Sequence, residues 1–165
     1  MLSVDSTIIS DCGRYRYCLT RKVAARGPVF AFFGVYPSVT DAEAGDAAMR
    51  KKMGFTRRWG GSLCVVGSIF AFRTSNVSVL GKCADSFGPH NAVELDNIIQ
   101  YADVLVPCWG ARSKLPERLR PRVAWLSGLL LASGKPVKCL GVTRSGDPCH
   151  PLMTGYDTPL VDFVV

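Results

Sequence analysis

Strand-length apolar runs that alternate with helix-like segments constrain the fold of this chain more than any other feature. The runs VFAFFGV at 29–35 and LCVVGSIFA at 63–71 are almost continuously apolar, as strands covered on both faces are. Two further runs, 103–109 and 137–142, also have the length of a strand. Residues 15–20 alternate between apolar and polar, which is typical of an edge or half-buried strand.

Segments with helical character lie between these runs. Helix-forming residues predict a helix over 42–55, and apolar residues recur at helical spacing in a second segment after Gly88. Pro121 suits the first turn of a third helix, which Gly134 would end. The order β-β-α-β-α-β-α-β predicts a single α/β domain over 1–165. We expect a three-layer sandwich with a mostly parallel central sheet of about four to five strands.

The ends of the predicted strands locate the functional site. In a sheet of this kind, ligands bind outside the carboxyl ends of the strands. This rule selects the loops YPSVTDAE, FAFRTSN, WGARSK and TRSGDPCHPL, each of which follows one predicted strand. We therefore expect these four loops to form one site.

Basic residues are clustered along the chain, which carries a net charge of +7. Fifteen of the twenty lysines and arginines fall within 14–26, 50–58 and 112–122. If the fold brings these segments to one face, they form a phosphate-binding surface for DNA or a nucleotide. The alternative is a set of solvated helix ends and loops. The candidate phosphate-binding residues are Arg50, Lys51, Lys52 and Arg112.

Several classes of protein are disfavoured. No apolar run reaches the length of a membrane span, and the N-terminal residues lack the layout of a signal peptide, so we expect a cytoplasmic protein. The seven cysteines include no CxxC pair, which indicates free thiols that pack as small hydrophobic groups. Only Cys149 and His150 are adjacent metal-ligating residues. This spacing leads us to expect no metal. The glycine patterns of phosphate-binding and dinucleotide-binding loops are absent, so we expect no cofactor. No obligate protein partner is evident from the sequence.

The loop after the first central strand combines a proline elbow with several carboxylates. Pro37 ends ladder pairing, and Ser38 is able to contact a phosphate or cap the next helix. Asp41, Glu43 and Asp46 follow within six residues, near a helix start that favours negative charge. Capping explains one carboxylate, and another is available for catalysis or for ordering a neighbouring arginine.

Three other positions have both a functional and a structural interpretation. His150 lies between two prolines, which hold it as a hydrogen-bond donor or as an ordinary loop histidine. Trp109 and Gly110 offer a stacking plane beside close backbone approach, although a tryptophan at a strand end is more often core. Phe70 is likewise either a stacking residue of the site or an ordinary core residue.

Six motifs along the chain resemble the domain of unknown function 1643 family of bacterial and phage proteins. They are YRYCLTR, FFGVYPSVTDAEAGD, WGGSLCVVGSIFAFR, GPHN, WGAR and CLGVTRSGDPCHPL. Their order and spacing cover roughly residues 14 to 160. This resemblance implies no biochemical function.

A second resemblance, to the uracil-DNA glycosylase superfamily, does imply one. The proline loop, the polar residue in the next strand, the WG strand end and the C-terminal HP loop are similar to that superfamily's site. By position, the resemblance makes Tyr36 the water-positioning residue, Ser68 the base-reading residue and His150 the stabiliser of the departing base. Phe70 or Trp109 would then stack on an extruded base.

Two departures from that superfamily change the expected substrate. Tyr36 and Ser68 stand where the superfamily has asparagine, and neither presents the paired donor and acceptor of an amide. We therefore expect a glycosylase-like enzyme that acts on a modified nucleobase in DNA or a nucleotide. Asp41 is the expected catalytic carboxylate, with Asp46 in reserve. The alternative function is a non-catalytic module that binds nucleic acid or a nucleotide.

Overall fold

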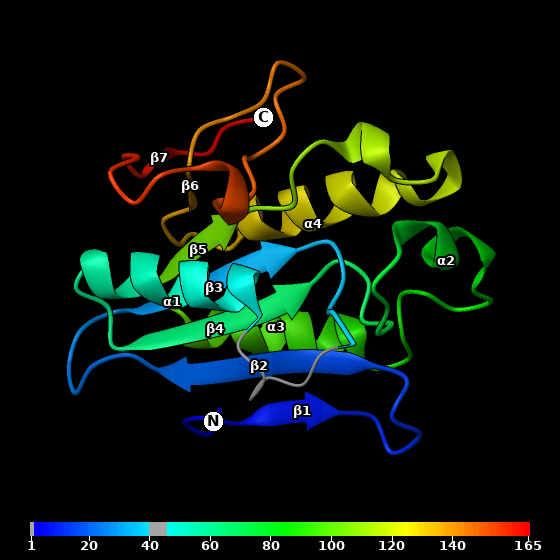
Figure 1. The fold of residues 1–165 in the computed structure, drawn as a ribbon, viewed down its shortest axis with the longest axis horizontal. Coiled ribbons are helices and arrows are strands. Elements are labelled where there is room, and N and C mark those ends of the chain that lie inside the picture. Colours follow the sequence, from blue (N-terminus) through cyan, green and yellow to red (C-terminus); the bar gives the residue numbers. More distant parts are fainter. Residues whose placement is uncertain (1, 40–45) are drawn as a thin grey trace.

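The computed structural model describes residues 2–39 and 46–165 of the chain. Its main feature is a five-stranded sheet with the strand order β1-β2-β4-β3-β5 (Figure 1). The strands are β1 (Thr7–Ile9), β2 (Arg16–Lys22), β3 (Val29–Gly34), β4 (Leu63–Ser68) and β5 (Val104–Pro107).

The sheet divides into a parallel and an antiparallel part. Strand β3 lies in the centre of the parallel part and pairs with both β4 and β5. Strand β2 pairs antiparallel with β4 and with β1. The prediction of a mostly parallel sheet is therefore wrong for two of the four pairings. The cause is the connection 23–28, which is too short for the crossover that parallel strands require.

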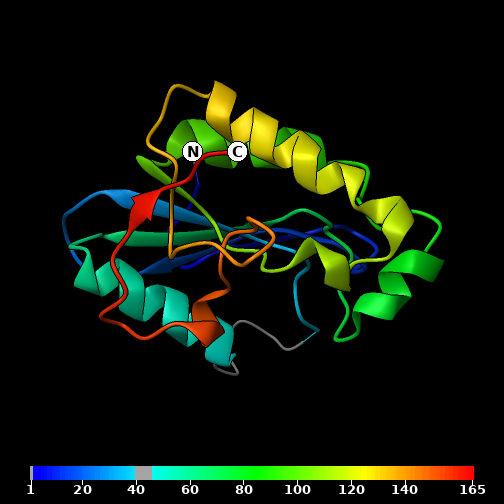
Figure 2. The same cartoon turned by 90° about the horizontal axis from the view of Figure 1, so that it is seen from above.

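Helices cover both faces of the sheet, as predicted (Figure 2). Phe30 and Phe32 of β3 pack with helix α1, while Ala31 and Phe33 pack with helices α3 and α4 on the opposite face. This alternation follows from the two-residue period of a strand. The helices are α1 (Ala47–Arg58), α2 (Val77–Lys82), α3 (Asn91–Tyr101) and α4 (Pro121–Ala132).

The predicted strand 137–142 does not form a strand of the main sheet. It contributes only β6 (Lys138–Cys139), which pairs antiparallel with β7 (Val161–Asp162), and an isolated bridge between Val137 and Leu105. Gly141, with φ of 91°, turns the backbone away from the extended path. Single-turn 3₁₀ helices lie in the flanking loops: η1 (Arg112–Lys114), η2 (Glu117–Leu119) and η3 (Pro151–Met153).

Two further features bear on the predicted class of protein. Throughout the described ranges, every helix is too short or too polar to cross a bilayer. All seven cysteines are free thiols, and four of them are buried. Burial raises the pKa of the Cys18 and Cys64 thiols to about 12, so both are protonated at neutral pH.

Candidate functional site

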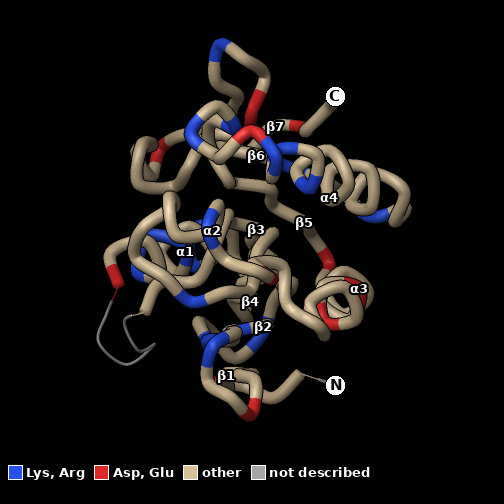
Figure 3. The backbone as a smooth tube through the Cα atoms, turned by 90° about the vertical axis from the view of Figure 1, so that its right-hand side faces the viewer, with Lys and Arg blue, Asp and Glu red and all other residues tan. Residues whose placement is uncertain are grey.

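A pocket of about 450 Å³ lies at the carboxyl ends of the three parallel strands. Gly34 and Ser68, the last residues of β3 and β4, both line it. Trp109 and Gly110 line it from the loop after β5, and His150 lines it from the loop after β6. Figure 3 views the molecule from the side toward which β3 and β4 point in Figure 1. The pocket therefore lies at the edge of the sheet where the sequence predicts the site.

Residues of the first loop reach the pocket together. Tyr36, Pro37 and Ser38 all line it, as do Asp46 and Lys52 from the start and middle of α1. The loop continues the pairing of β3 with β4, because the backbone N–H of Phe70 donates to Val35 at 2.9 Å. The N–H of Thr74 then donates to the Pro37 carbonyl at 3.1 Å. These backbone bonds fix the elbow against the segment that follows β4.

Asp46 lines the pocket and also caps α1. Its Oδ1 accepts the backbone N–H of Ala48 at 2.9 Å, which is the bond expected of an N-cap residue. Its Oδ2 accepts the hydroxyl of Ser38 at 3.4 Å. Asp46, expected as the reserve catalytic residue, is therefore the N-cap of α1, and the same contacts hold its carboxylate at the pocket wall. Asp41, the preferred catalytic residue, lies outside the described residues.

His150 is held as a neutral imidazole with a defined tautomer. Its Nδ1 accepts the backbone N–H of Leu152 at 3.2 Å, which leaves the proton on Nε2. Burial lowers its pKa to about 4, with further lowering by Lys52 and Lys114 and an opposing effect of Asp46. At neutral pH, Nε2 is therefore a hydrogen-bond donor without a positive charge.

Gly110 brings the loop after β5 close to His150. Its backbone N–H donates to the Pro148 carbonyl at 2.8 Å, and its φ is 75°. A Cβ atom at position 110 would lie 3.7 Å from the Cβ of His150. Glycine here permits the left-handed backbone that lets the two loops meet.

The predicted cationic residues are not equivalent in the structure. Lys52 is buried on the pocket wall, whereas Arg50 is an exposed residue of α1. The Lys51 ammonium lies 4.3 Å from the ring centre of Tyr156. The predicted stacking residue Phe70 is buried in the apolar core and is not among the described pocket residues.

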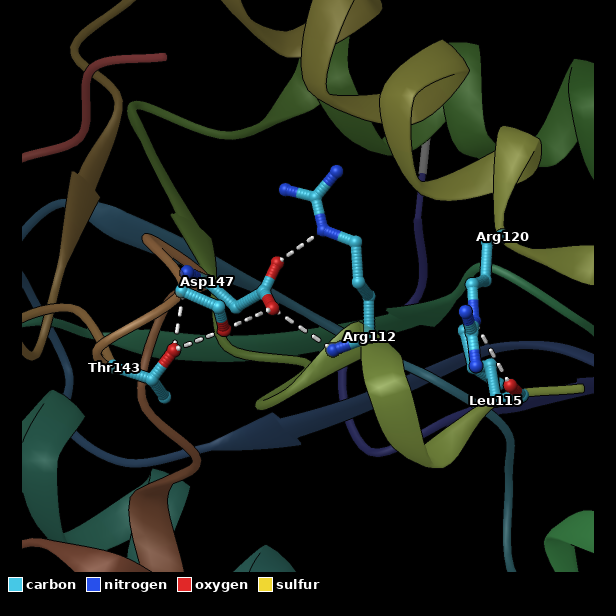
Figure 4. Close-up of polar contacts among 6 residues, drawn as sticks. Arg112, Leu115, Arg120, Thr143 and Asp147 are labelled. Carbon is cyan, nitrogen blue, oxygen red and sulfur yellow. Dashed lines mark hydrogen bonds and ion pairs between the residues drawn. The ribbon is translucent and has the colours of Figure 1, made fainter. Parts of the chain in front are cut away.

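Arg112 belongs to a cluster that joins two of the predicted loops (Figure 4). Its Nε lies 2.7 Å from Oδ1 of Asp147, and its backbone N–H donates to Oδ2 of Asp147 at 2.9 Å. Asp147 is fully buried and accepts a third hydrogen bond from the Ser145 hydroxyl at 3.0 Å. The backbone N–H of Asp147 donates to Thr143 at 3.2 Å. The backbone N–H and the Nε–H of Arg112 therefore serve loop structure.

Two cations and one amide are not among the candidate site residues. Arg16 of β2 and Lys114 of η1 lie in the basic clusters 14–26 and 112–122, and both line the pocket. The buried side chain of Asn91 donates to the carbonyls of Ser68 and Ile69, each at 3.1 Å, and so fixes the end of β4. Asn91 is part of the GPHN motif, for which the sequence patterns predicted no role. Arg16 carries no local signal, because its proximity to the pocket depends on strand order.

Within residues 2–39 and 46–165, no three histidine, cysteine, aspartate or glutamate side chains gather closely enough to hold a metal ion. His150 uses Nδ1 to accept a backbone N–H instead.

Comparisons with known proteins bear on the family alone. A model of the family described as protein of unknown function (DUF1643) matches residues 16–152, so the resemblance expected from the six motifs is confirmed. No curated protein and no solved structure matches the chain. The resemblance to uracil-DNA glycosylases thus stays a prediction.

Proposed function

The chain belongs to the DUF1643 family, and we propose that this member is a glycosylase-like enzyme that acts on a modified nucleobase in DNA or a nucleotide. The observation that carries the proposal is that a neutral histidine and a carboxylate line the same pocket. His150 supplies a neutral donor and Asp46 a negative charge. This pair matches the two charges that develop when an N-glycosidic bond breaks.

The pocket suits a nucleobase in size and lining. Its volume of about 450 Å³ lies within the range of small-molecule sites. Tyr36 and Trp109 provide aromatic surface on its wall, and Ser68 provides a hydroxyl at the end of β4. A hydroxyl donates one hydrogen bond and accepts others, so it suits a base edge that differs from that of uracil.

The reaction that we propose is hydrolysis at the anomeric carbon. The bond from that carbon to the base nitrogen breaks, and the base leaves with the electron pair. The Nε2–H group of His150 donates a hydrogen bond to the departing base, while the Asp46 carboxylate faces the positive charge on the sugar. Water forms the new bond to carbon, and its proton passes through the carboxylate to the base or to solvent.

A non-catalytic nucleotide-binding module is the second candidate function. It is favoured by the contacts of Asp46, since both carboxylate oxygens already accept hydrogen bonds within the protein. It is also favoured by the cations Arg16, Lys52 and Lys114, which outnumber the carboxylates on the described pocket wall.

Base release separates these functions. The protein is incubated with oligonucleotides and nucleotides that contain a panel of modified bases, and released base is measured by chromatography. The enzyme should release at least one base, and His150→Gln should reduce the rate by about 10²–10⁴-fold. The matched control is Lys51→Met, which should retain the wild-type rate, because the native Lys51 side chain packs on Tyr156. Binding without release by the wild-type protein would establish the module instead.

A further inference from the structure

A largely buried lysine on the pocket wall forms no ion pair in the described structure. Lys52 is 8% exposed and lines the pocket from the inner face of α1. Throughout residues 2–39 and 46–165, its side chain makes neither an ion pair nor a hydrogen bond. The ammonium is not one of the fully buried polar atoms of the described structure, so it faces the open space of the pocket. The position therefore suits an anion that enters the pocket with a ligand.

Two more cations share this pocket with Lys52. Arg16 reaches it from β2, and Lys114 reaches it from the exposed surface of η1. Asp46 is the one carboxylate on the described wall, and its oxygens are held by Ala48 and Ser38. The three cations come from separate elements of the fold and line one cavity, as expected of a binding site rather than of a solvated helix face.

The surplus of positive charge indicates the class of anion. One carboxylate against three cations leaves a net charge of +2 on the described wall, with His150 neutral. A phosphate monoester carries about two negative charges at neutral pH. Lysine binds phosphate as a point charge, and arginine binds it through its planar set of donors. A single carboxylate would neutralise only half of this surplus.

We propose that the pocket takes a free nucleoside monophosphate, with its terminal phosphate bound by Lys52, Arg16 and Lys114. The nucleoside half rests on the proposed function, whereas the phosphate half rests on the cations alone. In a nucleic acid strand, each internal phosphate is a diester with one negative charge and chain on both sides. A buried lysine on the pocket wall is better matched by a terminal group that enters the pocket with the ligand.

Binding measurements with defined probes test this proposal. Calorimetry compares inorganic phosphate, the common nucleoside 5′-monophosphates and the matching nucleosides, in buffer without other multivalent anions. The wild-type protein should bind at least one monophosphate about 10-fold or more tightly than its nucleoside, since a charge-assisted contact contributes that much. Lys52→Met should lose this difference and its affinity for inorganic phosphate, while affinity for the nucleoside stays unchanged.

Matched variants separate the pocket from general basicity. Lys51→Met removes the neighbouring charge on α1 and should leave phosphate affinity within about twofold, because Lys51 packs on Tyr156 and does not line the pocket. Lys114→Ala removes an exposed cation that lines the pocket. It should weaken monophosphate binding without affecting the fold, which circular dichroism checks. Equal binding of nucleosides and monophosphates, no binding of either, or wild-type affinity in Lys52→Met would each overturn the proposal.

Failure of the phosphate site and failure of the glycosylase function give different results in these experiments. Phosphate binding that depends on Lys52, without release of any base, would keep the anion site and remove the glycosylase. Base release from oligonucleotides at the wild-type rate by Lys52→Met, with no turnover of monophosphates, would keep the enzyme and remove the anion site.

Discussion

Two buried charges, one in the loops behind the pocket and one on its wall, have opposite surroundings. Asp147 is fully buried and receives hydrogen bonds from the backbone and side chain of Arg112 and from Ser145. Lys52 is nearly as buried, yet its ammonium makes no hydrogen bond or ion pair in the described parts of the chain. The Asp147 carboxylate is compensated by donors of the protein, whereas the Lys52 ammonium faces the pocket without a protein partner.

The contrast separates two uses of charge. The contacts of Asp147 join the loop after β5 to the loop after β6, so its charge stabilises the frame that holds His150. An unpaired lysine on a pocket wall is typical of positions that bind a ligand, where a charged group is placed for a partner that comes from outside.

The largest effect is expected at Asp147. Replacement by alanine leaves the backbone and side-chain donors of Arg112 without their acceptor. Because the guanidinium itself is partly exposed, the free energy of unfolding should fall by about 2–4 kcal/mol. Urea denaturation measures the change. Asp157→Ala, at an exposed aspartate, is the matched control and should stay within about 0.5 kcal/mol of wild type. Similar losses in the two variants would remove the structural role of the cluster.

His150 should make stability depend on pH. Its folded-state pKa of about 4 lies below the ordinary value of 6.5, so the unfolded chain takes up the proton first as pH falls. The contribution of the neutral imidazole is complete above pH 6.5 and is lost between pH 6.5 and 4. With allowance for solvent screening, the loss is roughly 2–3 kcal/mol.

Denaturation of the wild-type protein and of His150→Gln at a series of pH values isolates this contribution. The difference between the two free energies of unfolding should change across the window, because glutamine does not titrate. A constant difference from pH 7.5 to pH 4 would show that His150 is not held neutral.

Lys52→Met should stabilise the protein in the absence of ligand. Methionine keeps most of the side-chain volume and removes the uncompensated charge, so the free energy of unfolding should rise by about 1–2 kcal/mol. Added inorganic phosphate should reduce the difference in free energy of unfolding between the variant and the wild-type protein, since phosphate stabilises only the wild-type protein. Destabilisation by Lys52→Met in phosphate-free buffer would mean that the ammonium has a protein partner, and the comparison with Asp147 would fail.

Asp46 provides the smallest effect and an intermediate case, because it lines the pocket and also has partners. Asp46→Ala removes the cap of α1 and should lower the free energy of unfolding by about 1 kcal/mol. Asp46→Asn keeps a capping oxygen and should lose only a few tenths. If turnover falls in Asp46→Asn while stability is kept, the carboxylate acts in the reaction; equal turnover would restrict it to capping.

Much of the fold follows from local patterns, and the errors have identifiable causes. The continuous apolar runs became β3 and β4, and the helical periodicity after Gly88 became α3. The alternation over 15–20 is typical of an edge or half-buried strand, but β2 lies between β1 and β4 and is largely buried. Its covering strand β1 has three residues, which is too short for a periodic signal. Strand order is a tertiary property that no local pattern contains.

The candidate site also has parts that local patterns predict and parts that depend on tertiary contacts. The four loops could be predicted because parallel strands place their carboxyl ends at one edge of the sheet. The inward position of Lys52 also has a signal in the sequence, since it stands three residues after Met49 and three before Phe55, both buried. The contributions of Arg16 and Asn91 depend on contacts between distant elements. The preferred carboxylate, Asp41, lies outside the described residues and stays a prediction.

The position of η3 along the chain has a consequence for how the protein becomes functional. The three parallel strands of the pocket end by residue 107, whereas His150 and Met153 close the pocket from a segment more than forty residues later. During synthesis, the ribosome therefore releases the complete sheet before it releases the residues that finish the pocket. Contacts between such distant segments form slowly, because a long loop must close first. The capacity to bind ligand should then appear as a late kinetic event, after the sheet has acquired its protection from hydrogen exchange.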